Sequence, residues 1–208
     1  MKKLPSLFAI LATVVVALGL TNVGNVMAAK DYEMINPPQP TTSKDKIEVV
    51  ELFWYGCPHC FTLEPYVERW LKRKPANVKF VRMPGMFRPS WEIHGRAYYT
   101  AEVLGVVDKV HKPMFEAIHE QKRSLSDEAS IMALFKENGV SEEDFKRVFR
   151  SFAVETKLRR AKDMGQRYGV RGVPALIVNG KYRTGATKSG GNAKVFKVVN
   201  ELVEMESK

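Results

Sequence analysis

The two cysteines of this 208-residue chain, Cys57 and Cys60, are its only thiols and are separated by Pro58 and His59. Cysteines at this spacing can form a disulfide with each other with little movement of the backbone. Thiol–disulfide exchange needs a thiolate that attacks, a second thiol that resolves the mixed disulfide, and no further thiol that diverts the reaction. The sequence therefore predicts a pair that cycles between dithiol and disulfide.

The residues between the cysteines indicate how the pair is tuned. Pro58 suits the first position of a helix, which would place Cys57 at the helix N-terminus. Unpaired N–H groups and the positive end of the helix dipole stabilise a thiolate there, and a protonated His59 would lower the pKa of the Cys57 thiol further. Stabilising the thiolate makes the disulfide easier to reduce and the protein a stronger oxidant. Cys60, on the inner side of the first turn, is expected to resolve mixed disulfides.

Glu51 is a carboxylate in an otherwise apolar segment, six residues before Cys57. Burial there would raise the pKa of the carboxyl group and let it exchange a proton with Cys60. The alternative is a glutamate at the edge of a strand that faces water, and the alternation with Glu48 leaves both open. Lys79 is a candidate charge partner for Glu51 from a neighbouring strand.

Two other cysteine chemistries fit the sequence less well. A structural zinc site needs four ligands, and the two cysteines with the scattered His94, His111 and His119 do not supply a second paired cluster, so no metal is expected. A Cys–His hydrolase needs a base oriented from another element, and His59 is too close to Cys57 in sequence for that. The three scattered histidines are expected to be surface or packing residues.

Aromatic and methionine side chains are common near both cysteines and further along the chain. Such side chains suit the binding of unfolded polypeptides, but most of them in any sequence belong to the core. We expect some, not all, of the following to flank a groove at the site: Phe53, Trp54, Tyr55, Met83, Met86, Trp91 and Met114.

The first half of the chain predicts a strand–helix–strand unit around the cysteines. Residues 47–53 are β-branched and nearly continuously apolar, which indicates a buried strand, and residues 78–83 indicate a second. The helix that begins at Pro58 is expected to kink at Pro65.

A long helical segment follows, from residue 84 to about residue 168. Its apolar residues recur three and four positions apart, which is the helical period. Ser90, Asp127 and Ser141 are candidate N-caps, and Gly139 is a candidate helix stop.

The last part of the chain predicts a hairpin and a closing helix. Residues 173–178 have strand character, and Asn179-Gly180 is a strong signal for a turn into residues 181–183. Apolar residues in 195–203 indicate an amphipathic helix, whereas the proline-bearing residues 30–46 indicate an extended arm.

The order of elements predicts an α/β fold of the thioredoxin-like type that is interrupted by a helical insertion. Residues 29–84 and 169–208 would form the thioredoxin-like domain, and residues 85–168 the insertion.

The N-terminal residues indicate export. Lys2 and Lys3 precede an apolar run from Leu7 to Leu20, and Val26-Met27-Ala28 is a small-x-small cleavage site. This pattern predicts a cleaved signal peptide over residues 1–28, because the run is shorter than the ~20 residues that a membrane anchor needs. Export argues against nucleic acid as the reason for the formal net charge of +10.

The chain resembles the DsbA family of bacterial periplasmic disulfide oxidases over nearly all of its mature length, and two segments carry the resemblance. They are Glu51-Leu52-Phe53-Trp54-Tyr55-Gly56-Cys57-Pro58-His59-Cys60 and the segment from Arg171-Gly172-Val173-Pro174 to Tyr182. The resemblance implies that Cys57 is the exposed nucleophile, Cys60 its resolving partner and Glu51 a buried acid. It also implies that Pro174 is a cis-proline that faces the disulfide, preceded by Val173. The strongly basic charge departs from the best-known members.

The function that this resemblance implies is oxidation of reduced, unfolded exported polypeptides in the periplasm. The Cys57–Cys60 disulfide would be donated to them without a further cofactor, and a membrane quinone reductase of the DsbB type would reoxidise the protein, which is expected to be a monomer. Two alternatives stay open: a disulfide isomerase or reductase of the same superfamily, and a non-catalytic binding module with a structural disulfide. The second is weakened because closing so short a loop stabilises a fold little.

Overall fold

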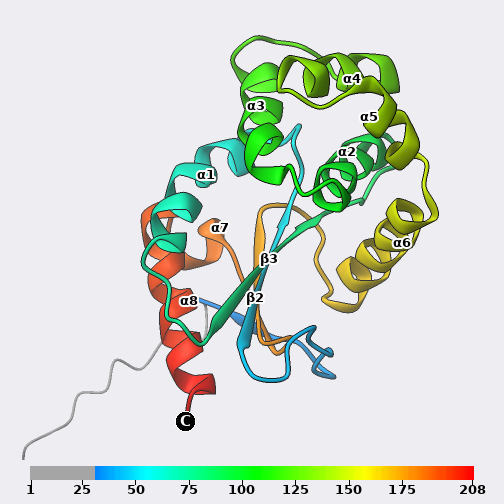
Figure 1. The fold of residues 1–208 in the computed structure, drawn as a ribbon. Coiled ribbons are helices and arrows are strands. Elements are labelled where there is room, and N and C mark those ends of the chain that lie inside the picture. The colour runs from blue at the N-terminus through cyan, green and yellow to red at the C-terminus, as the bar shows by residue number, and fades with distance from the viewer. Residues whose placement is uncertain (1–30) are drawn as a thin grey trace, which may run out of the picture.

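The structure, a computed structural model, describes residues 31–208, and the predicted signal peptide over residues 1–28 lies outside them. A central sheet is covered by helices, and a group of further helices lies at one end of it (Figure 1). No helix within residues 31–208 is both long enough and apolar enough to cross a membrane.

The sheet has the strand order β1-β5-β4-β2-β3. Strands β2 and β3 are parallel, and the other neighbouring pairs are antiparallel. All residues of β2 are buried, which fits a central strand with both faces covered. The α/β fold class is confirmed, as are the predicted strands and the hairpin at Asn179-Gly180. The strands are β1 (Glu33–Met34), β2 (Ile47–Phe53), β3 (Val78–Pro84), β4 (Ala175–Val178) and β5 (Tyr182–Thr184).

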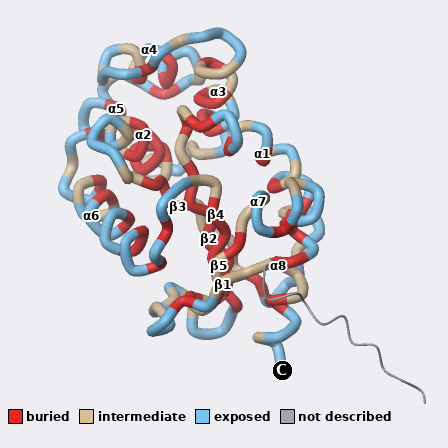
Figure 2. Tube along the Cα trace, turned by 180° about the vertical axis from the view of Figure 1, so that it is seen from behind, coloured by how far each residue is buried: buried red, intermediate tan, exposed pale blue. Residues whose placement is uncertain are grey.

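Side chains alternate along β2 and so meet different helices on the two faces of the sheet. Val49 packs into a core formed with α1 (Pro58–Leu71) and α8 (Asn192–Glu206). Val50 and Leu52 pack into a second core with the helices between β3 and β4. Figure 2 shows the sheet strands as a buried band with α6 on one side and α7 and α8 on the other. Each fully buried aliphatic side chain contributes about 1.5–3 kcal/mol.

The predicted helical segment is confirmed between β3 and β4. Asp127 and Ser141 are N-caps as predicted, and their side chains accept hydrogen bonds from the backbone N–H groups of Ser130 and Asp144. Ser90 is not a cap, because Pro89 opens a short 3-10 turn there instead. The elements are η1 (Pro89–Trp91), α2 (Glu92–Val103), α3 (Val107–His119), α4 (Glu128–Glu137), α5 (Glu142–Phe149) and α6 (Phe152–Arg167).

The N-terminal arm is more ordered than its sequence indicates. Ile35 N–H donates to the Lys181 carbonyl (2.7 Å), and Gln39 N–H donates to the Gly180 carbonyl (2.9 Å). The arm thereby adds β1 to the edge of the sheet. The sequence also does not indicate α7 (Ala186–Ser189), a helix of one turn after β5.

Candidate active site

Cys57 is placed by the turn that joins β2 to α1. It is the N-cap residue of α1, with Pro58 in the first helical position, as predicted. Its backbone N–H donates to the Trp54 carbonyl (3.0 Å), which closes the turn. Cys57 and Cys60 are both free thiols in this structure, so it represents the dithiol form.

The two thiols differ in environment, but neither is freely exposed. Cys60 is fully buried, and only 8 % of Cys57 is exposed. The resemblance implies an exposed Cys57, and the structure corrects this: the Cys57 Sγ lies 3.5 Å from the carbonyl oxygen of Val173, which belongs to the loop that covers it.

The pKa of the Cys57 thiol is lowered to about 6. The largest cause is a hydrogen bond from the Cys60 thiol, followed in the same direction by the backbone N–H groups of Cys60 and His59 and then by the charge of His59, whereas burial opposes them. Burial and the neighbouring Cys57 raise the pKa of Cys60 far above its ordinary value. One thiol of the pair therefore ionises at neutral pH while the other stays protonated.

Val173 faces Cys57 from the loop before β4, and Pro174 follows it in the chain. The peptide bond between them is cis, as the resemblance implies. A Cβ on Gly85 would lie 2.9 Å from Val173 Cγ1, so the absence of a side chain at Gly85 lets Val173 pack in its place. The loop is thereby fixed against the end of β3, and the Val173 carbonyl stays directed at the Cys57 sulfur.

Glu51 is buried, with 1 % of its surface exposed, so the buried interpretation is confirmed. Burial is the largest cause that raises the pKa of its carboxyl group, the charge of Glu64 adds to it, and Arg82 opposes it. Neither carboxylate oxygen has a hydrogen-bond partner within residues 31–208. Such a carboxyl group can hold a proton at neutral pH.

The predicted charge partner of Glu51 is wrong. Lys79 is opposite Glu48 in the β2–β3 register, on the other face of the sheet from Glu51, and its Nζ contacts the Thr42 hydroxyl at 3.0 Å. Arg82 is the residue opposite Glu51, and its Nε lies 3.5 Å from Glu51 Oε2.

Three residues that the sequence did not connect with Glu51 join it in a buried charge network, among them His111, which was expected to be a surface or packing residue. Arg82 also pairs with Glu64 of α1, one turn after Cys60 on the same helix face. His111 of α3 brings its Nε2 to 3.4 Å from Glu64 Oε1, and its Nδ1 lies 2.9 Å from the Tyr55 hydroxyl. Helix periodicity from Cys60 could have indicated Glu64, whereas nothing in the sequence indicated His111.

The other histidines pack against the same region. His94 is buried with its Nε2 3.1 Å from the Leu125 carbonyl, and His119 Nε2 donates to the Tyr55 carbonyl at 2.7 Å. No group of three or more His, Cys, Asp or Glu side chains within residues 31–208 is arranged to hold a metal ion.

Few of the candidate apolar side chains flank the cysteines at the surface. Phe53, Tyr55, Met83 and Met114 are buried in the core. Trp54 is partly buried and stacks on Trp91, with ring centroids 4.2 Å apart and an interplanar angle of 6°. The Trp54 ring also covers Gly56, because a Cβ there would overlap it. This stacked pair lies beside the turn that carries Cys57.

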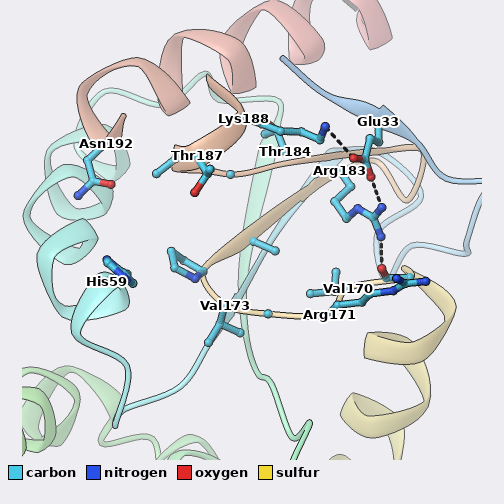
Figure 3. Close-up of a pocket in the computed structure, with 16 residues that line it drawn as sticks. Glu33, His59, Val170, Arg171, Val173, Arg183, Thr184, Thr187, Lys188 and Asn192 are labelled. Carbon is cyan, nitrogen blue, oxygen red and sulfur yellow. Dashed lines mark hydrogen bonds and ion pairs between the residues drawn. The ribbon is translucent and has the colours of Figure 1, made fainter. Parts of the chain in front are cut away.

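A pocket of about 770 Å³ opens on the other side of the Val173–Pro174 loop. Figure 3 shows His59 at one side of this pocket and Arg171 and Arg183 at the other, with Val173 between them. The pocket therefore adjoins the turn that contains Cys57 through His59 and Val173.

Comparisons with known proteins agree with this geometry. The sequence profile of the family described as "DSBA-like thioredoxin domain" matches residues 90–202. The thiol:disulfide interchange protein DsbA of Pseudomonas syringae pv. tomato is 40% identical over 181 residues, which are 87% of this chain and 85% of that protein. The corresponding protein of Burkholderia cepacia is 34% identical over 98% of this chain and 97% of its own length. The crystal structure of Pseudomonas aeruginosa DsbA superposes with a TM-score of 0.83 and 40% identity, over 86% of this chain and 93% of that one.

Proposed function

This chain belongs to the DsbA family of disulfide-forming thiol oxidoreductases, and we propose that its reaction is carried by Cys57 and Cys60, with Glu51, His59, Pro58, Val173 and Pro174 assisting. Its substrates are dithiols of other polypeptides. The proposal rests above all on the unequal acidities of the two thiols, with the pKa of Cys57 lowered to about 6 and that of Cys60 raised.

In the proposed reaction, a substrate thiolate attacks the Cys57 sulfur of the Cys57–Cys60 disulfide. The disulfide bond breaks, a mixed disulfide forms, and Cys60 leaves with the bonding electrons and takes up a proton. A second substrate thiolate then attacks the substrate sulfur of the mixed disulfide, and Cys57 leaves as a thiolate. The substrate has lost two electrons and gained a disulfide, and the protein has become the dithiol.

The proton that Cys60 takes up would come from Glu51. Its carboxyl group is buried, its pKa is raised, and its charge acts on the Cys60 thiol. We propose that a protonated Glu51 acts as general acid in this step and as general base when the disulfide re-forms. The proton would reach Cys60 without the need for bulk water to enter the core.

The low pKa of Cys57 favours an oxidase over the alternatives. A thiol with a lower pKa is a better leaving group, and stabilising the dithiol form makes the disulfide a stronger oxidant. A structural disulfide would stabilise the fold when it is formed, whereas a lowered pKa of Cys57 would stabilise the reduced form. A reductase would need a less stable dithiol, because it has to give up its electrons to the substrate disulfide.

Val173 would hold the substrate main chain. Its backbone faces Cys57, and an extended substrate segment could pair with it by strand addition. Pro174 withholds an N–H group beside this contact and keeps the local backbone rigid.

The setting of the reaction is part of the proposal. Residues 1–28 would be removed as a signal peptide, and the mature protein would act as a monomer in the periplasm on reduced, unfolded exported polypeptides. Residues 29–84 and 169–208 would form the thioredoxin-like domain, with residues 85–168 inserted. A membrane quinone reductase of the DsbB type would restore the disulfide, with no further cofactor, metal or nucleic acid.

The redox equilibrium with glutathione tests this function. We expect a mildly reducing glutathione buffer to reduce the Cys57–Cys60 disulfide, and urea unfolding to give a larger free energy of unfolding for the reduced protein than for the oxidised one. A disulfide that persists in a strongly reducing buffer, in a protein that is more stable when oxidised, would contradict the oxidase and support a reductase or a structural bridge. A Cys57→Ser variant provides the control without the redox pair.

A further inference from the structure

The pocket beside Val173 and Pro174 contains more positive than negative charge. Three cations line it, Arg171, Arg183 and Lys188, together with one carboxylate, Glu33. The sequence as a whole is strongly basic, and the reaction of Cys57 with a thiol does not by itself require cations here. Which of these cations already have an ion-pair or hydrogen-bond partner indicates what the pocket can bind.

Arg183 and Lys188 are already paired. The Arg183 Nη1 group donates to the carbonyl oxygen of Tyr168 at 2.9 Å and also to that of Gly169, and its Nη2 pairs with Glu33. Lys188 Nζ lies 2.7 Å from the other oxygen of Glu33. These contacts lower the pKa of Glu33 to about 2, so its carboxylate stays ionised and holds both cations in place.

Gly169, in the wall of the pocket, leaves room for the side chain of Arg183. Gly169 has a φ of +63°, a conformation that favours glycine, and a Cβ there would lie only 2.8 Å from Arg183 Nη1. The chain therefore needs a glycine at this point for Arg183 to reach the backbone. The pocket is a fixed feature and does not depend on mobile surface side chains alone.

Arg171 differs from the other two cations. It is exposed, and the structure gives it no ion-pair or hydrogen-bond partner within residues 31–208, in contrast to Arg183 and Lys188. It lies two residues before Val173, and no atom lies within 4 Å of the Cβ position of the intervening Gly172. An anion can therefore reach the Arg171 guanidinium group, whose planar fork of donors fits a carboxylate.

We propose that this pocket binds an aspartate or glutamate side chain of the substrate polypeptide, a few residues from the cysteine that attacks Cys57, and that Arg171 selects it. The inference rests on the proposed function, in which Val173 holds the substrate main chain. Extended residues rise about 3.3 Å each, so side chains close to the reacting cysteine reach the side of the loop where Arg171 lies. Acidic segments would then be oxidised faster than neutral ones.

The test uses oxidised mature protein and a set of short peptides with two cysteines. In each acidic peptide one aspartate lies at a different distance before or after the first cysteine, and the matched peptide has asparagine at the same position. Single-turnover rates of peptide oxidation are measured at low and high ionic strength. The variants are Arg171→Gln, Arg171→Lys and Lys72→Gln, the last being an exposed lysine at the far end of α1 from Cys57.

We expect the aspartate at one or two particular positions to raise the rate about fivefold over asparagine at low salt, and less at high salt. The Arg171→Gln variant should lose this preference, Arg171→Lys should retain part of it, and Lys72→Gln should retain all of it. For each protein the preference is the ratio of its aspartate rate to its own asparagine rate, and the asparagine peptides should react equally fast with wild type and Lys72→Gln.

Two results would overturn the inference and leave the proposed function intact. One is equal oxidation of aspartate and asparagine peptides by the wild-type protein. The other is a preference that is independent of the position of the aspartate and falls equally in Lys72→Gln and Arg171→Gln, which would indicate attraction by the overall charge. Failure to oxidise any peptide would contradict the proposed function itself.

Discussion

The carboxylate of Glu51 lies 3.5 Å from the guanidinium Nε of Arg82 on the neighbouring strand, and both groups are shielded from water. Arg82 also pairs with Glu64 and Glu68, so one cation faces three carboxyl groups. Its charge cannot compensate all three. Glu51 is the most buried of them and has the longest contact, and burial raises the pKa of its carboxyl group, so it is the group that retains a proton.

The first prediction concerns the stability of a Glu51→Gln variant. The folded protein binds the Glu51 proton more tightly than the unfolded chain does, so the contribution of this group is most favourable below its ordinary pKa of about 4.3 and is lost as the pH rises toward the raised value. Glutamine carries no titrating proton. As the pH rises from 5 to 8, the free energy of unfolding of Glu51→Gln should therefore increase relative to that of wild type by on the order of 1–2 kcal/mol.

Urea unfolding of the reduced proteins at several pH values measures this difference. Glu48→Gln is the matched control on the same strand, since Glu48 accepts a hydrogen bond from the Thr42 N–H at 2.9 Å and is not part of the Arg82 network. A Glu51→Gln variant whose stability follows the wild type at every pH would mean that Glu51 is ionised in the folded protein.

The second prediction separates the causes of the low Cys57 pKa. A Cys60→Ala variant lacks the thiol that donates to Cys57, which is the largest cause of the lowering. It should therefore raise the pKa of Cys57 toward its ordinary value of about 8.5. His59→Ala should raise it by less, because the charge of His59 is the smallest of the causes that lower it. Thiolate absorbance against pH gives both values, and the reverse order would make His59 the main determinant.

The elements around the cysteines were predictable because their signals are local. A run of β-branched residues gave β2, and Pro58 marked the start of α1 beside Cys57. The apolar neighbours of Glu51 indicated its burial, although the alternation with Glu48 left a position facing water open. By contrast, β1 has two residues, which is too short for any alternation to be recognised.

The partners of Glu51 and Cys57 were not predictable for a different reason. Arg82 becomes the partner of Glu51 only through the β2–β3 register. A register shift of one residue would turn the Arg82 side chain to the other face of the sheet. His111 reaches Glu64 only because α3 packs near α1, which depends on the tertiary arrangement of the insertion. The dominance of the Cys60 thiol over His59 depends on side-chain orientation, which spacing alone does not determine.

The third prediction concerns His111, which burial keeps neutral by lowering its pKa. The folded protein binds this proton less tightly than the unfolded chain, so the contribution of His111 to stability is complete above about pH 6.5 and is lost as the pH falls. Glutamine at this position can still bond to the Tyr55 hydroxyl but does not titrate. From pH 7 to pH 5, wild type should lose on the order of 1 kcal/mol more stability than His111→Gln.

Thermal or urea unfolding across this pH range tests the third prediction. His119→Gln is the matched control, on the same helix and half-buried. If His111→Gln kept the acid sensitivity of the wild type, the Glu64 carboxylate would be stabilising a protonated His111 instead.

The last prediction concerns Pro174, beside the Val173 carbonyl that lies 3.5 Å from the Cys57 sulfur. Alanine at this position would add a backbone N–H next to the bound substrate and allow the loop to move, because proline supplies neither that donor nor that freedom. The extra contact should hold the substrate after the mixed disulfide has formed, while the second substrate thiol loses its alignment for attack. Pro174→Ala should therefore slow the release of mixed disulfides about tenfold or more and leave the Cys57 pKa close to that of wild type.

Non-reducing gels of cells that express the Pro174→Ala variant should show substrates linked to Cys57. Pro75→Ala, at the far end of β3 from the site, is the matched control and should show none. Normal turnover without trapped complexes in Pro174→Ala would reduce Pro174 to a packing residue and would remove the loop from the release step.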